Sequence, residues 1–338
     1  MTRVASPEVD QDVFREKVKD VHSGYEDLKR EIGKVVIGQH KVIDLMIISM
    51  FTSSHSLLMG VPGLAKTLLV HSLADSTSLS FTRVQFTPDM MPSDLIGTEI
   101  LQEDRSTGQR AFRFVKGPLF TNMLLADEIN RTTPKTQAAL LQSMQERQVS
   151  AAGTTYQLDP PFLVFATQNP IEQEGTYPLP EAQLDRFLFR IDVDYPQHDE
   201  EIQMVMNTTS RAEATIEPVY TIDRLLAHQA LVRRIPASET VVRYAVALVR
   251  ATRPNGEGAN KFAEENIRWG AGPRASQSLI LAGKARALLQ GRFAVEKEDI
   301  DALAEPILVH RIMPTFKAEA EGVTARNLIE KCREMTRV

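Results

Sequence analysis

Five stretches in the first two thirds of the chain have the hydrophobic pattern of β-strands. Three are nearly continuous apolar runs, as in strands buried on both faces, and two alternate apolar with polar residues. Helical patterns separate several of them, and this alternation is typical of an α/β fold with a parallel sheet. In chain order the five stretches are 56–59, 81–86, 123–126, 162–167 and 188–193.

The other apolar residues recur at helical spacing. One or two amphipathic helices are expected over 11–34, an apolar helix over 43–48 and another helix over 136–147. The stretch Tyr195-Pro196-Gln197-His198 breaks the pattern, and we place a domain boundary there, with domains spanning 1–197 and 198–338. The second domain is helical in pattern, without a convincing strand pair. Its helices are expected at 200–209, 222–231, 238–252, 276–290 and 298–303.

Two stretches of the first domain have the pattern of β-hairpins. Residues 98–114 hold β-prone pieces around Ser106-Thr107-Gly108, and residues 148–158 are centred on Gly153. For residues 98–114, spacing alone favours an ordinary surface loop over a hairpin.

Composition narrows the class of protein. The chain has 338 residues, 43% of them hydrophobic and 25% charged, as in ordinary globular proteins. Its net charge of −5 gives no indication of a positively charged surface for nucleic acid. With one cysteine, no transmembrane run and no apolar leader at the start, we expect a cytoplasmic protein.

The candidate chemistry begins where the first strand ends. Gly60-Val61-Pro62-Gly63-Leu64-Ala65-Lys66-Thr67 joins that strand to a helix, and we call these eight residues the phosphate loop. Backbone N–H groups at such a turn converge on one point and attract phosphate. Lys66 can reach the β- and γ-phosphates of a nucleotide, and the Thr67 hydroxyl can ligate magnesium. Further nucleotide contacts are expected from Gly60, Pro62, Gly63, Leu64, Ala65 and Leu68.

Ala65 stands where a phosphate loop usually has its second glycine. A methyl group is tolerated there if the backbone is already helical, whereas a positive φ would oppose it. We expect the helical backbone.

The third strand ends in two carboxylates, Asp127 and Glu128. Next to a phosphate loop, the first can hold magnesium through water and the second can polarise the attacking water. The fourth strand ends in Gln168-Asn169-Pro170, where Asn169 either contacts the γ-phosphate or simply forms the turn before the proline.

Together these motifs resemble the AAA+ ATPases and, within them, the MoxR family. The resemblance covers nearly the whole chain. It also rests on Glu174-Gly175-Thr176-Tyr177-Pro178-Leu179-Pro180-Glu181-Ala182-Gln183-Leu184-Asp185-Arg186-Phe187 and on Gly272-Pro273-Arg274-Ala275-Ser276. It implies an α/β nucleotide domain with a five-stranded parallel sheet and helices on both faces, followed by a small all-α lid. It further implies ATP and Mg²⁺ as ligands and a ring, expected to be a hexamer, with ATP at the subunit boundaries.

The resemblance also implies roles for single residues. Asn169 resembles the first sensor, Arg186 the arginine finger that enters the neighbour's site, and Arg274 a second sensor on the γ-phosphate of its own subunit. Arg131 and Arg190 are rivals for the finger. From sequence alone, the favoured alternative for Arg186 is a surface ion pair with Asp185 or Glu181. For adenine we expect Ile37 and Gly38.

The function expected is magnesium-dependent ATP hydrolysis in a ring that remodels or activates protein partners. The resemblance implies partners with von Willebrand factor A domains. The two hairpins resemble insertions that relate this group to ring-shaped helicase loaders and chelatase motors. A nucleic-acid motor is the alternative, and a nucleotide-gated scaffold without turnover is a third possibility. The full set of Lys66, Thr67, Asp127 and Glu128 disfavours the scaffold.

Overall fold

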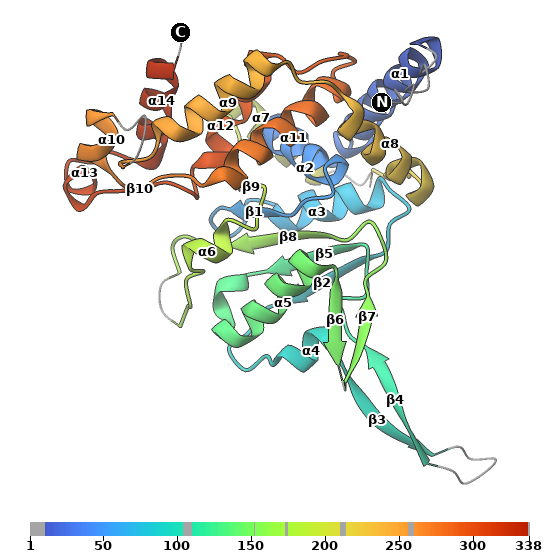
Figure 1. Cartoon of the computed structure of the whole chain (residues 1–338). Coiled ribbons are helices and arrows are strands. Elements are labelled where there is room, and N and C mark those ends of the chain that lie inside the picture. Colours follow the sequence, from blue (N-terminus) through green and yellow to red (C-terminus); the bar gives the residue numbers. More distant parts are fainter. Residues whose placement is uncertain are drawn as a thin grey trace, which may run out of the picture.

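The centre of the molecule is a five-stranded sheet whose neighbouring strands all run parallel (Figure 1). The computed structural model describes residues 11–103, 110–151, 153–172, 175–209, 214–255 and 260–336. The five predicted strands and the parallel α/β fold are thereby confirmed. In spatial order the strands are β2 (Phe81–Gln85), β5 (Met123–Asp127), β8 (Leu163–Gln168), β1 (Ser56–Met59) and β9 (Phe189–Asp192).

Successive residues of the apolar strands point to opposite faces of the sheet and enter two separate cores. Leu58 and Leu125 belong to one core, whereas their neighbours Leu57 and Leu124 belong to the other. Burial on both faces is the reason that these strands are apolar throughout.

Helices cover both faces (Figure 1). One face carries α1 (Gln11–Ile32), α2 (His40–Phe51) and α3 (Lys66–Asp75), whose apolar residues share a core with the sheet. The other face carries α4 (Pro92–Ile96) and α5 (Pro134–Glu146). Two short elements, η1 (Ile129–Arg131) and α6 (Glu181–Leu184), lie in the connections.

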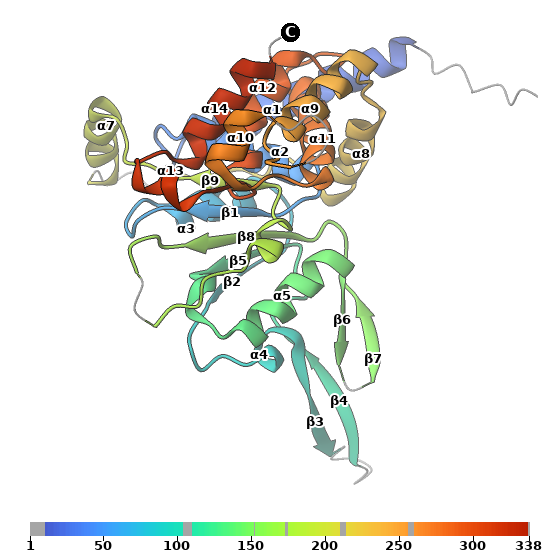
Figure 2. The same ribbon diagram turned by 60° about the vertical axis from the view of Figure 1, so that its left-hand side comes forward.

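Both predicted hairpins are present, and they project from the α5 side of the sheet (Figure 2). The first pairs β3 (Gly97–Glu103) with β4 (Arg110–Lys116), and the second pairs β6 (Gln148–Ala151) with β7 (Thr154–Gln157). Phe114 stacks on Tyr156 with ring centroids 4.5 Å apart, so the two hairpins touch. The predicted turn residues Ser106-Thr107-Gly108 lie outside the described residues.

The lid is a layer of helices above the α1 and α2 side of the sheet (Figures 1 and 2). The five predicted helices of this region are present, and α10, α13 and α14 join them. In chain order the helices are α7 (His198–Thr208), α8 (Ile222–Arg234), α9 (Glu239–Ala251), α10 (Lys261–Asn266), α11 (Pro273–Leu289), α12 (Lys297–Leu308), α13 (Phe316–Ala320) and α14 (Ala325–Thr336).

The expectation of no strand pair in this region was wrong. β10 (Ile267–Trp269) pairs antiparallel with β11 (Met313–Pro314). Strands of three and two residues are too short to show an alternating pattern in the sequence.

The first two helices contact the lid as well as the sheet. His22 of α1 hydrogen-bonds the Leu289 carbonyl at the end of α11 over 2.7 Å, and Asp20 pairs with Arg224 of α8 over 2.7 Å. The core that contains α1, α2 and α3 therefore continues into the lid. The boundary at 197/198 stays a prediction, because the two predicted domains share this core. Within the described ranges, no helix is long and apolar enough to cross a membrane.

Candidate nucleotide site

The phosphate loop leaves the carboxyl end of β1 and enters α3 at Lys66. Lys66 Nζ donates to the carbonyl of Gly60 over 2.5 Å and to that of Val61 over 2.8 Å. Burial lowers the pKa of Lys66, and the negative charges of Asp127 and Glu128 oppose that shift. The ammonium group thus lies in the field of the two carboxylates predicted for the same site.

The backbone expectation for Ala65 was wrong. Ala65 has φ +55°, in the left-handed region, and Gly63 in the same loop has φ +86°. The chain changes direction sharply between the strand and the helix. Ala65, the last residue before α3, takes up the left-handed conformation that this turn requires. Ala65 holds a conformation that costs an L-residue about 1 kcal/mol or more.

Asp127 ends β5, beside β8 in the sheet. Its Oδ1 accepts a hydrogen bond from the Thr167 hydroxyl over 2.6 Å. Its Oδ2 accepts two from the Arg83 guanidinium, over 2.7 and 3.1 Å. The carboxylate is buried, and its orientation is set by strands on both sides of β5.

Glu128 follows directly and has φ +55°. Its carboxylate accepts hydrogen bonds from Gln85 Nε2 over 2.6 Å and from Arg131 Nη1 over 2.9 Å. Its backbone N–H donates to the Thr167 hydroxyl over 2.8 Å. Thr167 therefore connects both acidic residues to β8.

Asn169 lies one residue beyond β8, at the same edge of the sheet, and is buried. Its Oδ1 accepts the backbone N–H of Ile171 over 3.1 Å, which is the turn-forming contact considered from the sequence. A sensor role for Asn169 stays a prediction.

The residues fit a magnesium ion that is held mainly by phosphates. In the described ranges, no group of three or more His, Cys, Asp or Glu residues could hold a metal ion. Magnesium at nucleotide sites is usually bound by one or two protein oxygens, substrate phosphates and water, so the donors at Thr67 and Asp127 suffice. Asp127 retains acceptor capacity beyond its bonds to Arg83 and Thr167.

The predicted adenine contacts lie between the end of α1 and the start of α2. Gly38 has φ +68°, and a Cβ built there would lie 2.5 Å from the Glu200 carboxyl carbon of α7. The backbone at Gly38 thus packs closely against the first turn of α7. A contact of Ile37 or Gly38 with adenine stays a prediction.

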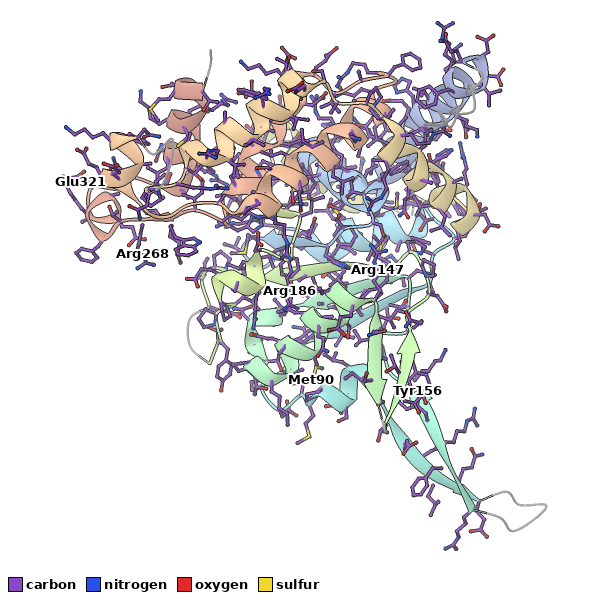
Figure 3. The ribbon with its side chains drawn as sticks, viewed as in Figure 1. Met90, Arg147, Tyr156, Arg186, Arg268 and Glu321 are labelled. Carbon is purple, nitrogen blue, oxygen red and sulfur yellow. The ribbon has the colours of Figure 1, made fainter. Side chains whose placement is uncertain are left out.

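Arg186 and Arg274 lie together in a cavity that contains no residue of the phosphate loop. Both line a cavity of about 360 Å³ between the end of α5 and the lid, as does Arg147. Figure 3 labels Arg147 and Arg186 of these three residues. Arg274 Nη1 lies 3.2 Å from Asp185 Oδ2, and Arg186 Nη1 donates to the Leu141 carbonyl over 2.6 Å. The Asp185 carboxylate thus pairs with Arg274, rather than with Arg186 as the sequence alternative had it.

The implied contact of Arg274 with its own subunit's γ-phosphate has no counterpart in this geometry. α11 begins at Pro273 and directs Arg274 toward Asp185, away from the phosphate loop. A lid residue that does share a cavity with the phosphate loop is Arg326, which the sequence analysis did not single out.

The rival arginines both pair with carboxylates at the edge of the sheet that bears the phosphate loop. Arg131 is bound to Glu128, and Arg190 Nε lies 3.0 Å from Asp192 Oδ1. All these arginines thus have partners within their own chain, and the choice of finger among them stays a prediction.

Sequence reasoning also missed Thr167, Arg83 and Gln85, which orient the two carboxylates. Thr167 was visible as a polar residue at the end of an apolar strand. Arg83 and Gln85 were visible only as polar positions of an alternating strand. Their importance follows from the order of the strands, which puts β2 and β8 on either side of β5.

A phosphate loop and a strand-terminal carboxylate pair on a parallel sheet, under a helical lid, define an AAA+ ATPase. Comparison with protein families agrees. Residues 55–189 match the ATPase family associated with various cellular activities, and residues 259–332 match the AAA lid domain.

Similar proteins identify the family more closely. Chaperone MoxR1 of Mycobacterium tuberculosis is 41% identical over 89% of this chain and 78% of its own length, and protein MoxR of Paracoccus denitrificans is 32% identical over 90% and 94%. YeaC of Bacillus subtilis is 38% identical over 95% and 96%. A crystal structure of a protein from Cytophaga hutchinsonii matches with a TM-score of 0.88 and 42% identity over 96% of this chain and 98% of its own. The chain belongs to the MoxR family of AAA+ ATPases.

Proposed function

We propose that this protein hydrolyses ATP with Mg²⁺ at the carboxyl edge of the sheet and uses the energy to remodel or activate protein partners. The observation that carries the proposal is the alignment of the phosphate loop after β1 with Asp127 and Glu128 after β5. These strands are parallel and have β8 between them, so their carboxyl ends share one edge. Phosphate donors and acidic groups thereby meet in one place.

Each residue of the site has a role in this proposal. Lys66 and the loop N–H groups bind the phosphates, while Thr67 and Asp127 hold Mg²⁺, which when bound neutralises phosphate charge. Glu128, oriented by Gln85 and Arg131, polarises the attacking water. Asn169 helps to position that water or the γ-phosphate.

The remaining positive charge comes from a neighbouring copy of the chain. Arg186 is the arginine finger, and Arg274, in the same cavity, acts beside it on the neighbour's ATP. A cluster of arginines away from the chain's own phosphate loop supports this assignment, which requires a head-to-tail ring. Six subunits are the expected number.

The hairpins are the surfaces that we assign to protein clients. β3 and β4 expose Leu101 and Phe112, which face each other across the ladder and are 55% and 72% exposed. Exposed apolar side chains on a projecting hairpin are typical of a protein-binding surface. A partner with a von Willebrand factor A domain remains the expected client, and the cytoplasm the expected compartment.

Substitution of Glu128 tests the proposal. Glu128→Gln should bind ATP with unchanged affinity, while phosphate release falls about a hundredfold or more, because the amide cannot activate water. Glu321→Gln, at an exposed lid position, is the matched control and should hydrolyse ATP normally. Wild-type turnover by Glu128→Gln would contradict the assignment. If this variant instead captures DNA in place of protein, and the binding weakens with added salt, the nucleic-acid motor is favoured.

A further inference from the structure

The end of lid helix α12 holds the segment that carries the proposed arginine finger. Arg186 lies in the connection between α6 and β9. Arg311, three residues beyond the end of α12, reaches this connection with a side chain that is only 3% exposed. Its guanidinium donates to the Asp185 carboxylate over 2.7 Å and to three carbonyls of the connection, those of Phe187 over 2.7 Å, Leu188 over 3.2 Å and Asp185 over 3.4 Å. One buried side chain thus fixes the backbone on both sides of Arg186.

The charge of Arg311 makes this attachment hard to displace. Burial lowers the pKa of Arg311, and the hydrogen bond and negative charge of Asp185 oppose that shift. A buried charge is tolerated only when it is paired and hydrogen-bonded, so a shift of the connection would leave the guanidinium without its partners. The neighbouring His310 donates from Nε2 to the same Phe187 carbonyl over 3.1 Å. Two consecutive lid residues therefore resist movement of the connection.

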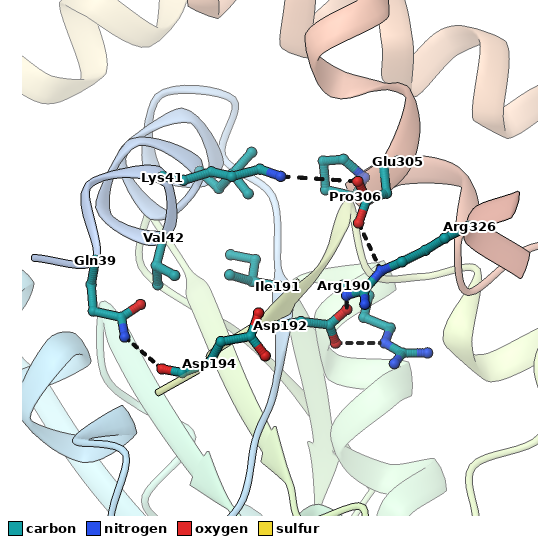
Figure 4. Close-up of a pocket in the computed structure, with 11 residues that line it drawn as sticks. Gln39, Lys41, Val42, Arg190, Ile191, Asp192, Asp194, Glu305, Pro306 and Arg326 are labelled. Carbon is teal, nitrogen blue, oxygen red and sulfur yellow. Dashed lines mark hydrogen bonds and ion pairs between the residues drawn. The ribbon is translucent and has the colours of Figure 1, made fainter. Parts of the chain in front are cut away.

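The strand that follows the connection is attached to the lid at its other end as well. β9 is the edge strand of the described sheet and pairs there with β1. Arg326 of α14 binds the carboxylates of Asp192, the last residue of β9, and of Glu305 (Figure 4). Carboxylate side chains can turn to follow a moving partner, whereas carbonyls are part of the backbone. Of these two attachments, the one at Arg311 is therefore the one suited to fix the backbone at Arg186.

We propose that Arg311 is a positioning residue for the arginine finger: it fixes the backbone beside Arg186, so that the Arg186 guanidinium reaches ATP bound by the neighbouring chain. Arg311 acts through the backbone and does not itself touch the nucleotide. The inference rests on the proposed function, in which Arg186 is the finger. Misplacement of a group by about 1 Å can cost about a hundredfold in rate. Loss of this anchor therefore slows hydrolysis in the neighbour's site and leaves ATP binding in the chain's own site unchanged.

Arg311→Lys tests the proposal. Lysine retains the charge beside Asp185 but lacks the planar fork that binds the carboxylate and the carbonyls together. Phosphate release should fall about tenfold or more, while the Kd for ATP stays at the wild-type value. Arg292→Lys is the matched control. Arg292 is another lid arginine bound to a buried carboxylate, that of Asp299, and its bonds among the described residues stay within 290–299, so this variant should hydrolyse ATP normally.

Mixing with Glu128→Gln distinguishes a finger defect from a general structural defect. Glu128→Gln chains do not hydrolyse ATP but supply an intact finger, so they should raise phosphate release per Arg311→Lys chain toward the wild-type rate. Thr167→Val, which disturbs the carboxylates of its own site, should gain nothing from the same mixing.

Unchanged hydrolysis in Arg311→Lys, or a loss that mixing does not restore, would overturn the proposal. Should Arg311→Lys not fold, Arg311→Gln is measured in the same way, since it buries no charge and has only two N–H donors for the same acceptors. A different result would point to the finger itself: if Arg186→Ala hydrolyses ATP at the wild-type rate, that part of the proposed function is refuted, and the positioning role with it.

Discussion

Arg274 and Asp185 form an ion pair of 3.2 Å between the first turn of lid helix α11 and the residue that precedes Arg186. Arg311 of the lid binds the other Asp185 oxygen over 2.7 Å. The lid is thus attached to the segment that carries the proposed arginine finger. In the proposed ring, movement of the lid would therefore also move Arg186.

Arg186→Ala should leave ATP binding intact and lower hydrolysis about a thousandfold or more, because the positive charge is needed only in the transition state. Arg274→Ala should reduce hydrolysis in the same direction. The measurement is phosphate release together with equilibrium ATP binding.

Mixing provides the control. Glu128→Gln retains both arginines and Arg186→Ala retains the catalytic carboxylate, so a mixture of the two should hydrolyse more ATP than either alone. No gain on mixing, or equal turnover per chain in dilute monomer and concentrated protein, would contradict a finger supplied in trans.

Thr167→Val should lower kcat about tenfold or more with little change in the Kd for ATP. The hydroxyl donates to Asp127 and accepts the Glu128 N–H, and valine keeps the shape while it removes both bonds. Thr155→Val, on exposed β7, is the matched control and should leave kcat unchanged. Unchanged kcat in Thr167→Val would show that the carboxylates hold their positions without it.

Ala65→Gly and Gly63→Ala should shift stability in opposite directions. Gly63 has φ +86°, and no other atom lies within 4 Å of the point that an added Cβ would occupy, so alanine there costs only backbone strain, about 1 kcal/mol. Glycine at Ala65 removes a similar strain, partly offset by the greater entropy of the unfolded chain. Urea unfolding measures both changes, and a loss of more than about 1 kcal/mol in Ala65→Gly would contradict the strained backbone.

Acid should destabilise the protein through His55. Burial lowers the pKa of His55 to about 4, and its Nδ1 accepts the Val164 N–H over 3.0 Å, a bond that protonation would break. Between about pH 6.5 and 4 the unfolded chain binds more protons than the folded one. The free energy of unfolding therefore falls as the pH drops through this window, by about 3 kcal/mol from this residue.

Urea unfolding at several pH values measures the loss of stability. NMR titration of the His55 ring shows whether protonation of this residue causes it. The His55 ring should stay neutral in folded protein at pH 5. Protonation of His55 near pH 6.5 in the folded state would contradict the prediction.

The sequence by itself determined the five strands of the central sheet, most helices, the phosphate loop and the carboxylate pair. These features depend on local patterns, since burial on both faces demands apolar runs, and phosphate binding demands a short turn before a helix. Both hairpins were also visible as turn residues between β-prone pieces.

Only the tertiary structure decided which charges meet. Strand order brought Arg83, Gln85 and Thr167 to the two carboxylates, and packing of the lid directed Arg274 to Asp185 and Arg326 to the phosphate loop. The positive φ of Ala65 was hidden for a similar reason: the surrounding turn imposes it against the residue's own preference. Contacts between residues far apart in the chain depend on how elements pack, and no local pattern of apolar and polar positions records that arrangement.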